Sequence, residues 1–369
     1  MTERLYRYEV DTDPALLQPG PMIVAFDGFF DAGMAQRLLV DHLLEAGDPT
    51  VVASFDVDSL IDYRSRRPVI TFDANRYVDY DDPALLLYHL LDRDGQTYYV
   101  LTGPEPDYRW EAVIEAITAI MDDLGITLVA HAHGIPMAVP HSRPVGMTVH
   151  GTDERLIGEH KPVFGTVQVP ASLAALLEMR LGESSRDAVG FSIHVPHYLA
   201  QSTFHDAALT ALNAIVDVTG LNLPNDALVE AAREGRIQIE REVEDNDEVR
   251  EAVQALERQY DVHLRGLERP SLLAGEGEDL PSADEIGFAN TEGSHQAAPS
   301  TTVPTAASGS RAKGYAVAAS STAVTTSHHR GKKPSRVTRP SITSSRSTIS
   351  SHHDSSTDSG APSQRCSSP

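Results

Sequence analysis

Short apolar runs alternate with amphipathic stretches along the first 285 residues of the chain. The apolar run from Met22 to Phe26 predicts a strand, and the helical spacing of apolar residues from Asp31 to Ala46 predicts a helix that ends at Gly47. By the same criteria, strands are expected at 51–55, 69–72, 126–132, 145–149 and 188–195, and helices at 110–124, 173–177 and 204–216. Strands that alternate with helices indicate a sheet with helices on both faces.

One connection in this pattern is expected to be an antiparallel hairpin. The runs Leu85–Leu91 and Thr97–Leu101 are joined through the sequence DRDG, in which Asp-Gly tolerates the positive φ of a tight turn. The fold class is therefore α/β with a mixed sheet, because parallel strands connected by helices share the sheet with this antiparallel pair.

The character of the sequence changes at residue 225. A narrow helical stripe of apolar residues among many charges predicts a helical appendage over 225–286, after an α/β domain over 1–224. The stripe consists of Val249, Val253, Leu256 and Tyr260. A stripe this narrow favours contact with a partner surface, so we expect a homo-oligomer. The alternative is that the stripe packs back on its own domain.

Residues 287–369 are rich in Ser, Thr, Ala, Pro, Arg and His, with almost no large apolar side chains. Such a segment cannot offset the entropy of folding, so a disordered tail is predicted. The tail is basic, with nine Lys or Arg against three Asp or Glu. Two interpretations stay open: a flexible arm that contacts the acidic body or an anionic partner, or a sequence translated past a frameshift in a GC-rich gene.

Composition excludes several classes of protein. The formal net charge of -23 argues against a nucleic-acid partner, because phosphate contacts need clustered Lys and Arg. The single cysteine, Cys366, lies in the tail, so the folded part offers no thiol for a disulfide, a nucleophile or a zinc-thiolate site. This fits a cytoplasmic protein. No segment offers the ~18 apolar residues of a membrane span, so no membrane partner is expected.

The segment Gly134–Pro144 follows an apolar strand and is expected to form a rigid loop, since it contains three prolines within nine residues. Alternation along an extended loop sends His141 and Arg143 the same way. An arginine there would bind a carboxylate or phosphate, and a histidine would titrate near neutral pH. The alternative is that ion pairs with some of the 53 acidic residues hold the loop in place.

A second group of candidate ligand-binding residues surrounds the end of the first predicted strand. Asp27, Gly28 and Gly33 lie between strand and helix, where glycines let backbone N–H groups approach an anion. Glu105 follows the second hairpin strand and can project into the same crevice, where paired carboxylates would suit acid–base chemistry or a divalent ion. The structural alternatives are a tight turn with Asp31 as a helix cap, and Glu105 as the cap of the helix that follows it.

Histidines near other strand ends are expected to be structural. His131 and His133 flank Ala132 on one face of a strand, and such a pair chelates a metal when a third ligand converges on it. His194 and His197 point to opposite faces of an extended segment, which argues against a joint metal site. No serine lies in a G-x-S-x-G pattern. The sequence therefore predicts no metal, no cofactor and no hydrolase nucleophile.

Four segments, in order along the chain, carry a resemblance to a known family. They are AFDGFFDAG at 25–33, LTGPEPD at 101–107, GIPMAVPHSRP at 134–144 and VPHYLAQ at 195–201. Together they resemble the bacterial branch of the proteasome assembly chaperone family, over about residues 5–285. The resemblance implies a three-layer α/β fold like that of nucleoside phosphorylases, and it does not by itself imply an activity.

Two hypotheses of different class follow. The first is a non-enzymatic protein that binds or assembles other proteins, with a proteasome-related partner implied by the resemblance. The second is an enzyme or binding protein for a small molecule or nucleotide, phosphorylase-like or carboxylate-amine ligase-like, acting in the crevice of the candidate residues. Those crevice residues are Asp27, Gly28, Glu105, His141 and Arg143. No complete catalytic motif supports the second hypothesis, so the first is preferred, and whether any catalysis occurs stays open.

Overall fold

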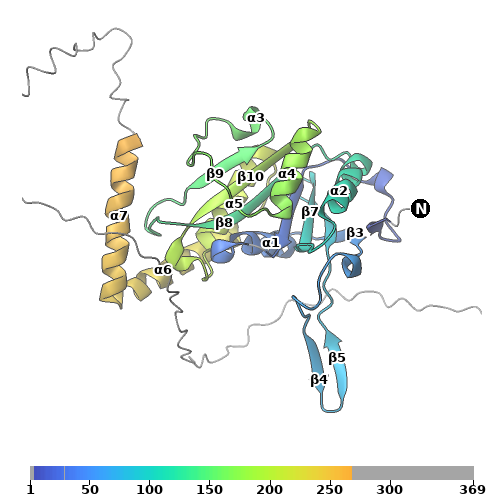
Figure 1. The fold of residues 1–369 in the computed structure, drawn as a ribbon, viewed down its shortest axis with the longest axis horizontal. Helices are drawn as coiled ribbons and strands as arrows, with labels where there is room; N and C mark the ends of the chain where they lie inside the picture. Colours follow the sequence, from blue (N-terminus) through green and yellow to red (C-terminus); the bar gives the residue numbers. More distant parts are fainter. Residues whose placement is uncertain (1–3, 29, 268–369) are drawn as a thin grey trace, which may run out of the picture. The chain divides into compact units, whose positions relative to one another are not determined.

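The computed structural model describes residues 4–28 and 30–267 (Figure 1). Its main sheet has eight strands in the order β1-β3-β6-β7-β2-β8-β10-β9. These strands are β1 (Tyr6–Tyr8), β2 (Met22–Asp27), β3 (Thr50–Phe55), β6 (Leu86–Leu91), β7 (Thr97–Pro104), β8 (Leu128–Met137), β9 (Met147–Gly151) and β10 (Asp187–Pro196). The α-helices are α1 (Ala35–Ala46), α2 (Trp110–Leu124), α3 (Glu154–Ile157), α4 (Leu173–Glu183), α5 (His205–Thr219), α6 (Asp226–Glu244) and α7 (Asp247–Leu267).

The sheet is mixed, as the sequence predicts. Strand β2 lies between β7 and β8 and is parallel to both, and β8 is parallel to β10. The predicted hairpin β6–β7 is antiparallel, and so are the outer pairs β1–β3, β3–β6 and β9–β10. The carboxyl ends of the four parallel strands therefore meet at one edge, where α/β proteins usually bind ligands.

Helices cover both faces of this sheet, which confirms the expected three-layer arrangement. Successive side chains of a strand point to opposite faces, so the neighbours Ile23 and Val24 enter different cores. Val24 shares its core with Ile117 of α2 and Leu177 of α4. Ile23 shares the other core with Leu212 of α5 and with residues of α1. Each fully buried aliphatic side chain stabilises the fold by about 1.5–3 kcal/mol.

Helix α2 begins and ends as the sequence predicts. Its residues Val113, Ile117 and Leu124 are buried because apolar side chains recur every three or four positions. Gly125 ends the helix with a φ of 65°, and its N–H donates to the carbonyl of Met121. Only glycine adopts this left-handed conformation without a steric cost, so a glycine at this position stops the helix.

Strand β8 is longer than the prolines predict. The expected irregular loop from Gly134 is wrong for residues 134–137, because β8 continues to Met137 and pairs with β10 along its whole length. Strand β2 pairs with β8 only as far as His131, so Pro136 lies where β8 has one unpaired edge. Proline is tolerated at such an edge because its missing N–H costs no ladder hydrogen bond.

A second, two-stranded sheet stands off the main one (Figure 1). The apolar run 69–72 predicts a strand, and the structure pairs it, as β4 (Ile70–Asp73), with β5 (Arg76–Tyr80). Strand β5 is not evident in the hydrophobic pattern, because polar residues interrupt it. The hairpin β4–β5 belongs to neither core, since all its residues are exposed except Val78, which is partly buried.

Helices α6 and α7 follow the α/β layers. Helix α6 packs against α5 and buries Leu228, Ala232 and Ile239. Helix α7 contacts α6, and Val253 of the predicted stripe is only 5% exposed, so part of the stripe packs within its own chain. Among residues 4–267, no helix is long and apolar enough to cross a membrane. The rest of the predicted appendage, the predicted tail and Cys366 lie outside the described residues.

Candidate functional site

A depression lies at the end of β2. Its volume is about 300 Å³, and its lining residues are Phe26, Asp27, Gly28, Phe30, Asp31, Met34, Gln36 and Arg37. Asp27 and Gly28 are exposed there, but Gly33 is buried, and a Cβ on it would meet Val195 and Phe204. Of the six predicted ligand-binding residues, Asp27 and Gly28 line this depression, and Gly33, Glu105, His141 and Arg143 do not.

Glu105 lies beside Gly28, but its carboxylate is bonded within the protein. The residue is 9% exposed, and its Oε1 accepts a hydrogen bond of 2.7 Å from the backbone N–H of Leu173, the first residue of α4. A carboxylate at this position satisfies a helix N–H that has no partner within the helix, and the helix dipole favours its charge. Glu105 therefore caps α4, whereas the structural alternative from the sequence was the following helix, α2.

Asp31 fastens the start of α1 to strand β8. Its carboxylate accepts backbone N–H bonds from Gln36 at 2.9 Å and Arg37 at 3.1 Å, in the first turn of α1. It also accepts one from Gly134 of β8 at 3.1 Å. Burial raises the pKa of Asp31, and these hydrogen bonds oppose the increase because they favour the charged form. This is the helix-cap role given above as the structural alternative.

His141 and Arg143 are held by other parts of the chain. The hydroxyl of Tyr198 lies 2.6 Å from His141 Nδ1 and accepts the backbone N–H of His141 at 2.8 Å. Arg143 makes a bidentate pair with Asp261 of α7, with two N···O distances of 2.9 Å, and lies 3.6 Å from Glu257. A bidentate pair fixes the guanidinium plane. The loop 138–146 is thereby attached to α7, and the ligand-binding role of its two residues stays a prediction.

Arg143→Ala is expected to loosen α7 from the loop. The substitution removes both donors to Asp261, while the two cores of the sheet are untouched. Amide hydrogen exchange over 247–267 should rise, and exchange in β8 and β10 should stay the same, because local openings depend on local contacts. Arg155→Ala is the matched control, since Arg155 pairs with Asp187 of β10 instead. Unchanged exchange in α7 would argue that Arg143 serves another role.

A polar cluster lies on the face of the sheet that α4 covers. His131 of β8 and His150 of β9 both stand opposite Gly190, on the strand β10 between them. A Cβ at Gly190 would lie 2.1 Å from Cε1 of His150 and 2.7 Å from Nε2 of His131. The absence of a side chain at this position therefore leaves the space in which the two imidazoles meet.

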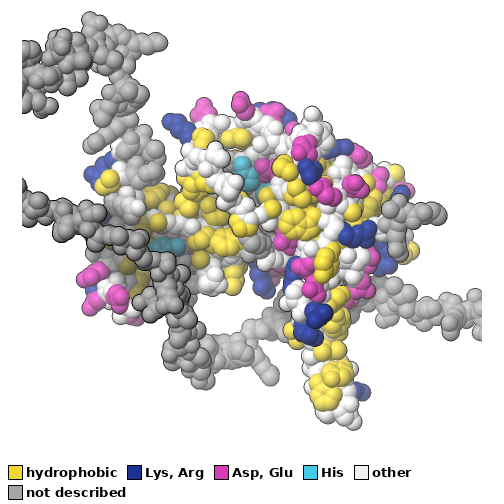
Figure 2. Space-filling model, viewed as in Figure 1, with side chains coloured by type: hydrophobic (Ala, Val, Ile, Leu, Met, Phe, Trp, Pro, Cys, Tyr) yellow, Lys and Arg dark blue, Asp and Glu magenta, His cyan; other side chains and the backbone are white. Residues whose placement is uncertain are grey.

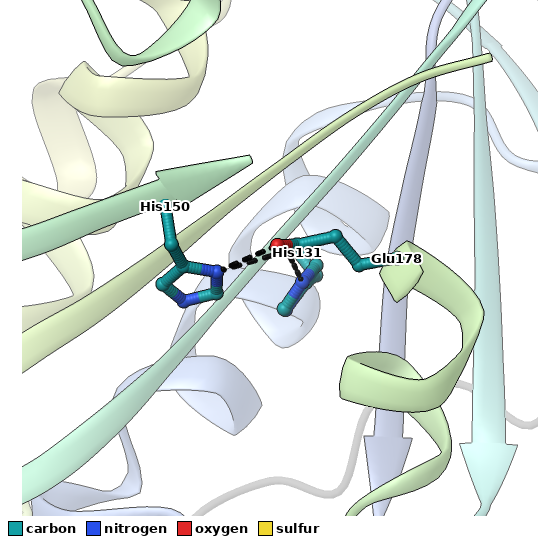
Figure 3. A group of neighbouring side chains, drawn as sticks. All are labelled: His131, His150 and Glu178. Carbon is teal, nitrogen blue, oxygen red and sulfur yellow. Dashed lines mark hydrogen bonds and ion pairs between the residues drawn. The ribbon is translucent and has the colours of Figure 1, made fainter. Parts of the chain in front are cut away.

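Glu178 of α4 completes the cluster, and its carboxylate lies between the two rings (Figure 3). Its Oε2 is 2.8 Å from Nε2 of His131 and 2.9 Å from Nδ1 of His150. Burial opposes the charge of Glu178, but the hydrogen bonds from both histidines lower its pKa to about 2, so it is ionised at neutral pH. We call His131, His150 and Glu178 the His–Glu cluster. The exposed fraction rises from 5% for the His131 side chain to 36% for that of His150.

Polar residues continue from the His–Glu cluster along the same strands. His133 stands opposite Ser192, which in turn stands opposite Thr148. Burial, together with the two histidines of the cluster, lowers the pKa of His133 to about 4, so its ring is neutral at neutral pH. Ser192 Oγ lies 3.4 Å from Nε2 of His150. The His–Glu cluster is therefore one end of a polar row.

The sequence signals only part of the His–Glu cluster. The spacing of His131 and His133 on one strand face raises the question of a third ligand, and the sequence analysis expects none. The structure supplies His150 from β9 and Glu178 from α4, which sequence reasoning missed. A glycine within the predicted strand 188–195 is the available signal, because a glycine inside a strand often marks a close approach of other groups.

Hairpin β4–β5 carries a second surface feature, an apolar face exposed to solvent. Cross-strand partners share a face, and the pairs here are Phe72 with Tyr77 and Ile70 with Tyr80. The rings of Phe72 and Tyr77 are 5.0 Å apart in an edge-to-face arrangement, yet these residues are 58% and 69% exposed. Figure 2 shows hydrophobic side chains along the projecting hairpin. We call these four residues the hairpin face.

Comparison with known proteins adds to this geometry. Residues 25–243 match the family model described as the PAC2 family. A Mycobacterium tuberculosis protein of unknown function is 40% identical, with a TM-score of 0.68, over 73% of this chain and 92% of its own. A Corynebacterium glutamicum protein of unknown function is 35% identical, with a TM-score of 0.67, over 72% of this chain and 100% of its own. A proteasome-assembly chaperone homologue of Mycobacterium tuberculosis shares the fold at 23% identity, with a TM-score of 0.58, over 63% of this chain and 99% of its own. No curated protein matches this chain in sequence.

Proposed function

Because this chain belongs to the PAC2 family, we propose that it acts by binding other proteins, in the manner of an assembly chaperone, and not by catalysis. The observation that carries the proposal is the exposed hairpin face. Burial of one large apolar side chain contributes about 1.5–3 kcal/mol, and this gain is lost while the side chain faces water. Contiguous exposed apolar patches on soluble proteins mark protein-interaction sites.

A second copy of this chain is the partner that fits the hairpin face. A two-stranded hairpin without a hydrophobic face packed on another element is only marginally stable in water. Hairpin β4–β5 packs in neither core, so a partner that covers it permanently would stabilise it. Another copy can cover the hairpin permanently, whereas a transient client does not. Permanent homo-oligomer interfaces are also the more hydrophobic kind.

The assembled copies would then present their remaining surface to a client protein. The name of the proteasome-assembly chaperone homologue from Mycobacterium tuberculosis suggests a client related to the proteasome. The formal net charge of -23 favours a client with a basic surface, because complementary potentials steer association and disfavour wrong partners.

The double substitution Phe72→Ser and Tyr77→Ser is expected to convert an oligomer into a monomer. Two exposed rings at the centre of an interface contribute a large part of its binding energy, so the dissociation constant should rise by at least about 100-fold. Light scattering on the full-length chain at micromolar concentration measures this change. A proteasome-assembly assay with unassembled core-particle subunits of the source organism then tests the client, and the wild-type chain should increase the yield of particles.

The matched control is Leu91→Ser with Tyr108→Ser. Both residues are apolar and about half exposed, at 54% and 50%, but they lie outside hairpin β4–β5. A wild-type monomer, or an oligomer that survives the hairpin substitutions, would overturn the self-association. If the chain self-associates but leaves particle yield unchanged, the proteasome-related client is excluded. A melting temperature that rises with nucleotides or nucleosides would favour the enzyme hypothesis instead.

A further inference from the structure

The His–Glu cluster has the donor set of a metal site. Two imidazole nitrogens and one carboxylate oxygen come from three different elements, and their ligand atoms all lie within 4.8 Å of one another. We propose that His131, His150 and Glu178 bind one Zn²⁺ ion. This inference does not depend on the proposed protein-binding function.

The donor types favour Zn²⁺ over Mg²⁺ and Ca²⁺. Mg²⁺ and Ca²⁺ prefer oxygen ligands, and two of the three donors here are imidazoles. Two histidines and one glutamate form a recognised zinc ligand set, with a water or another ligand in the fourth position. This ligand set contains no cysteine thiolate. The chain's single cysteine lies outside the described residues.

The geometry requires only small side-chain movements. Ligand atoms bound to a tetrahedral Zn²⁺ at about 2.0–2.2 Å are roughly 3.3–3.6 Å apart. The carboxylate already lies 2.8 Å and 2.9 Å from the two ring nitrogens, so the ion would enter by widening these contacts. The more exposed His150 side chain can move outward, while His131 is held in the core. Zinc would displace the ring protons that now point at Glu178.

The surroundings provide room and an outer partner for this ion. Gly190 leaves open the space between the imidazoles, because any Cβ there would contact both rings. Ser192 Oγ, at 3.4 Å from Nε2 of His150, can orient the ring from its far side. Such outer hydrogen bonds fix the tautomer and plane of metal-bound histidines.

The test measures zinc binding by the full-length chain after chelator treatment and dialysis, with ZnCl₂ as the only ligand. We expect one tightly bound zinc per chain and a higher melting temperature with zinc, because an ion that prefers the native state stabilises it by mass action. In His150→Ala and in Glu178→Gln, the dissociation constant should rise by more than about 100-fold. Loss of an outer partner alone already costs about 10- to 100-fold.

His89→Ala is the matched control, because His89 is a half-buried strand histidine on β6, outside the His–Glu cluster. It should keep both the zinc and the thermal shift. Zinc that persists in His150→Ala and Glu178→Gln, or zinc that leaves the melting temperature unchanged, would overturn the proposal. If the variants do not fold, anomalous diffraction from zinc-soaked wild-type crystals decides. A zinc peak between the two imidazoles supports the site, and its absence there contradicts it.

Discussion

Gly134→Ala is expected to destabilise the fold by about 3 kcal/mol or more, the upper end of the usual cost of overpacking. A Cβ at Gly134 would lie 1.9 Å from the carbonyl oxygen of Ala32 and 2.9 Å from its carbonyl carbon. Both atoms belong to the backbone, so no rotation of a side chain relieves the overlap. Strand β8 and the segment before α1 would have to separate. Urea unfolding of the full-length chain, followed by circular dichroism, measures the change.

Gly165→Ala is the matched control for this prediction. A Cβ at Gly165 meets no atom within 4 Å, so the added methyl group should change stability by no more than about 0.5 kcal/mol. Equal stability of Gly134→Ala and wild type would show that the backbone of Ala32 does not approach β8 so closely.

Asp31→Ala is expected to destabilise the fold by about 1.5–5 kcal/mol. Loss of a helix cap costs about 0.5–2 kcal/mol, and the N–H bonds of Gln36 and Arg37 are the cap here. The N–H of Gly134 also loses its acceptor, and an unsatisfied buried donor costs about 1–3 kcal/mol. The same unfolding experiment measures the sum of these two effects.

Asp27→Ala separates this structural role from a general effect of removing a carboxylate. Asp27 is four positions earlier in the same segment and is exposed, so its replacement should change stability little. If both variants are equally stable, Asp31 is not a cap. Asp31 and Gly134 share one contact. The free energy of unfolding should therefore fall less in the double variant Asp31→Ala and Gly134→Ala than the sum of the decreases in the two single variants.

The secondary structure was largely predictable because its signals are local. Helix α2 has apolar residues at helical spacing and a glycine directly after its last residue, so its bounds follow from the sequence. The hairpin β6–β7 follows from two apolar runs and an Asp-Gly turn. The family was also predictable, and the match over residues 25–243 confirms it. The prediction of a loop from the prolines was wrong for the end of β8, because whether a strand edge is paired depends on its neighbours in the sheet.

The candidate site was predictable only in part. The sequence placed Asp27 and Gly28 at a strand end, and the structure shows them lining a depression. It also offered His141 and Arg143 as one polar pair, without indicating that Arg143 binds Asp261 of α7, 118 residues later. Hydrophobic periodicity reports which side chains are buried, and it contains no information about which distant residue a polar side chain meets.

By itself, the amino-acid sequence determined the α/β class, the mixed sheet, the family and most helices and strands, since each depends on spacing and turn residues along a continuous stretch. The tertiary structure alone decided which elements meet. It brought Glu105 to the first residue of α4, 68 positions away, and Glu178 to His131, 47 positions away. It also left the hairpin face outside both cores. The order of strands in the sheet sets these meetings, and that order arises from packing both faces at once, which no local pattern records.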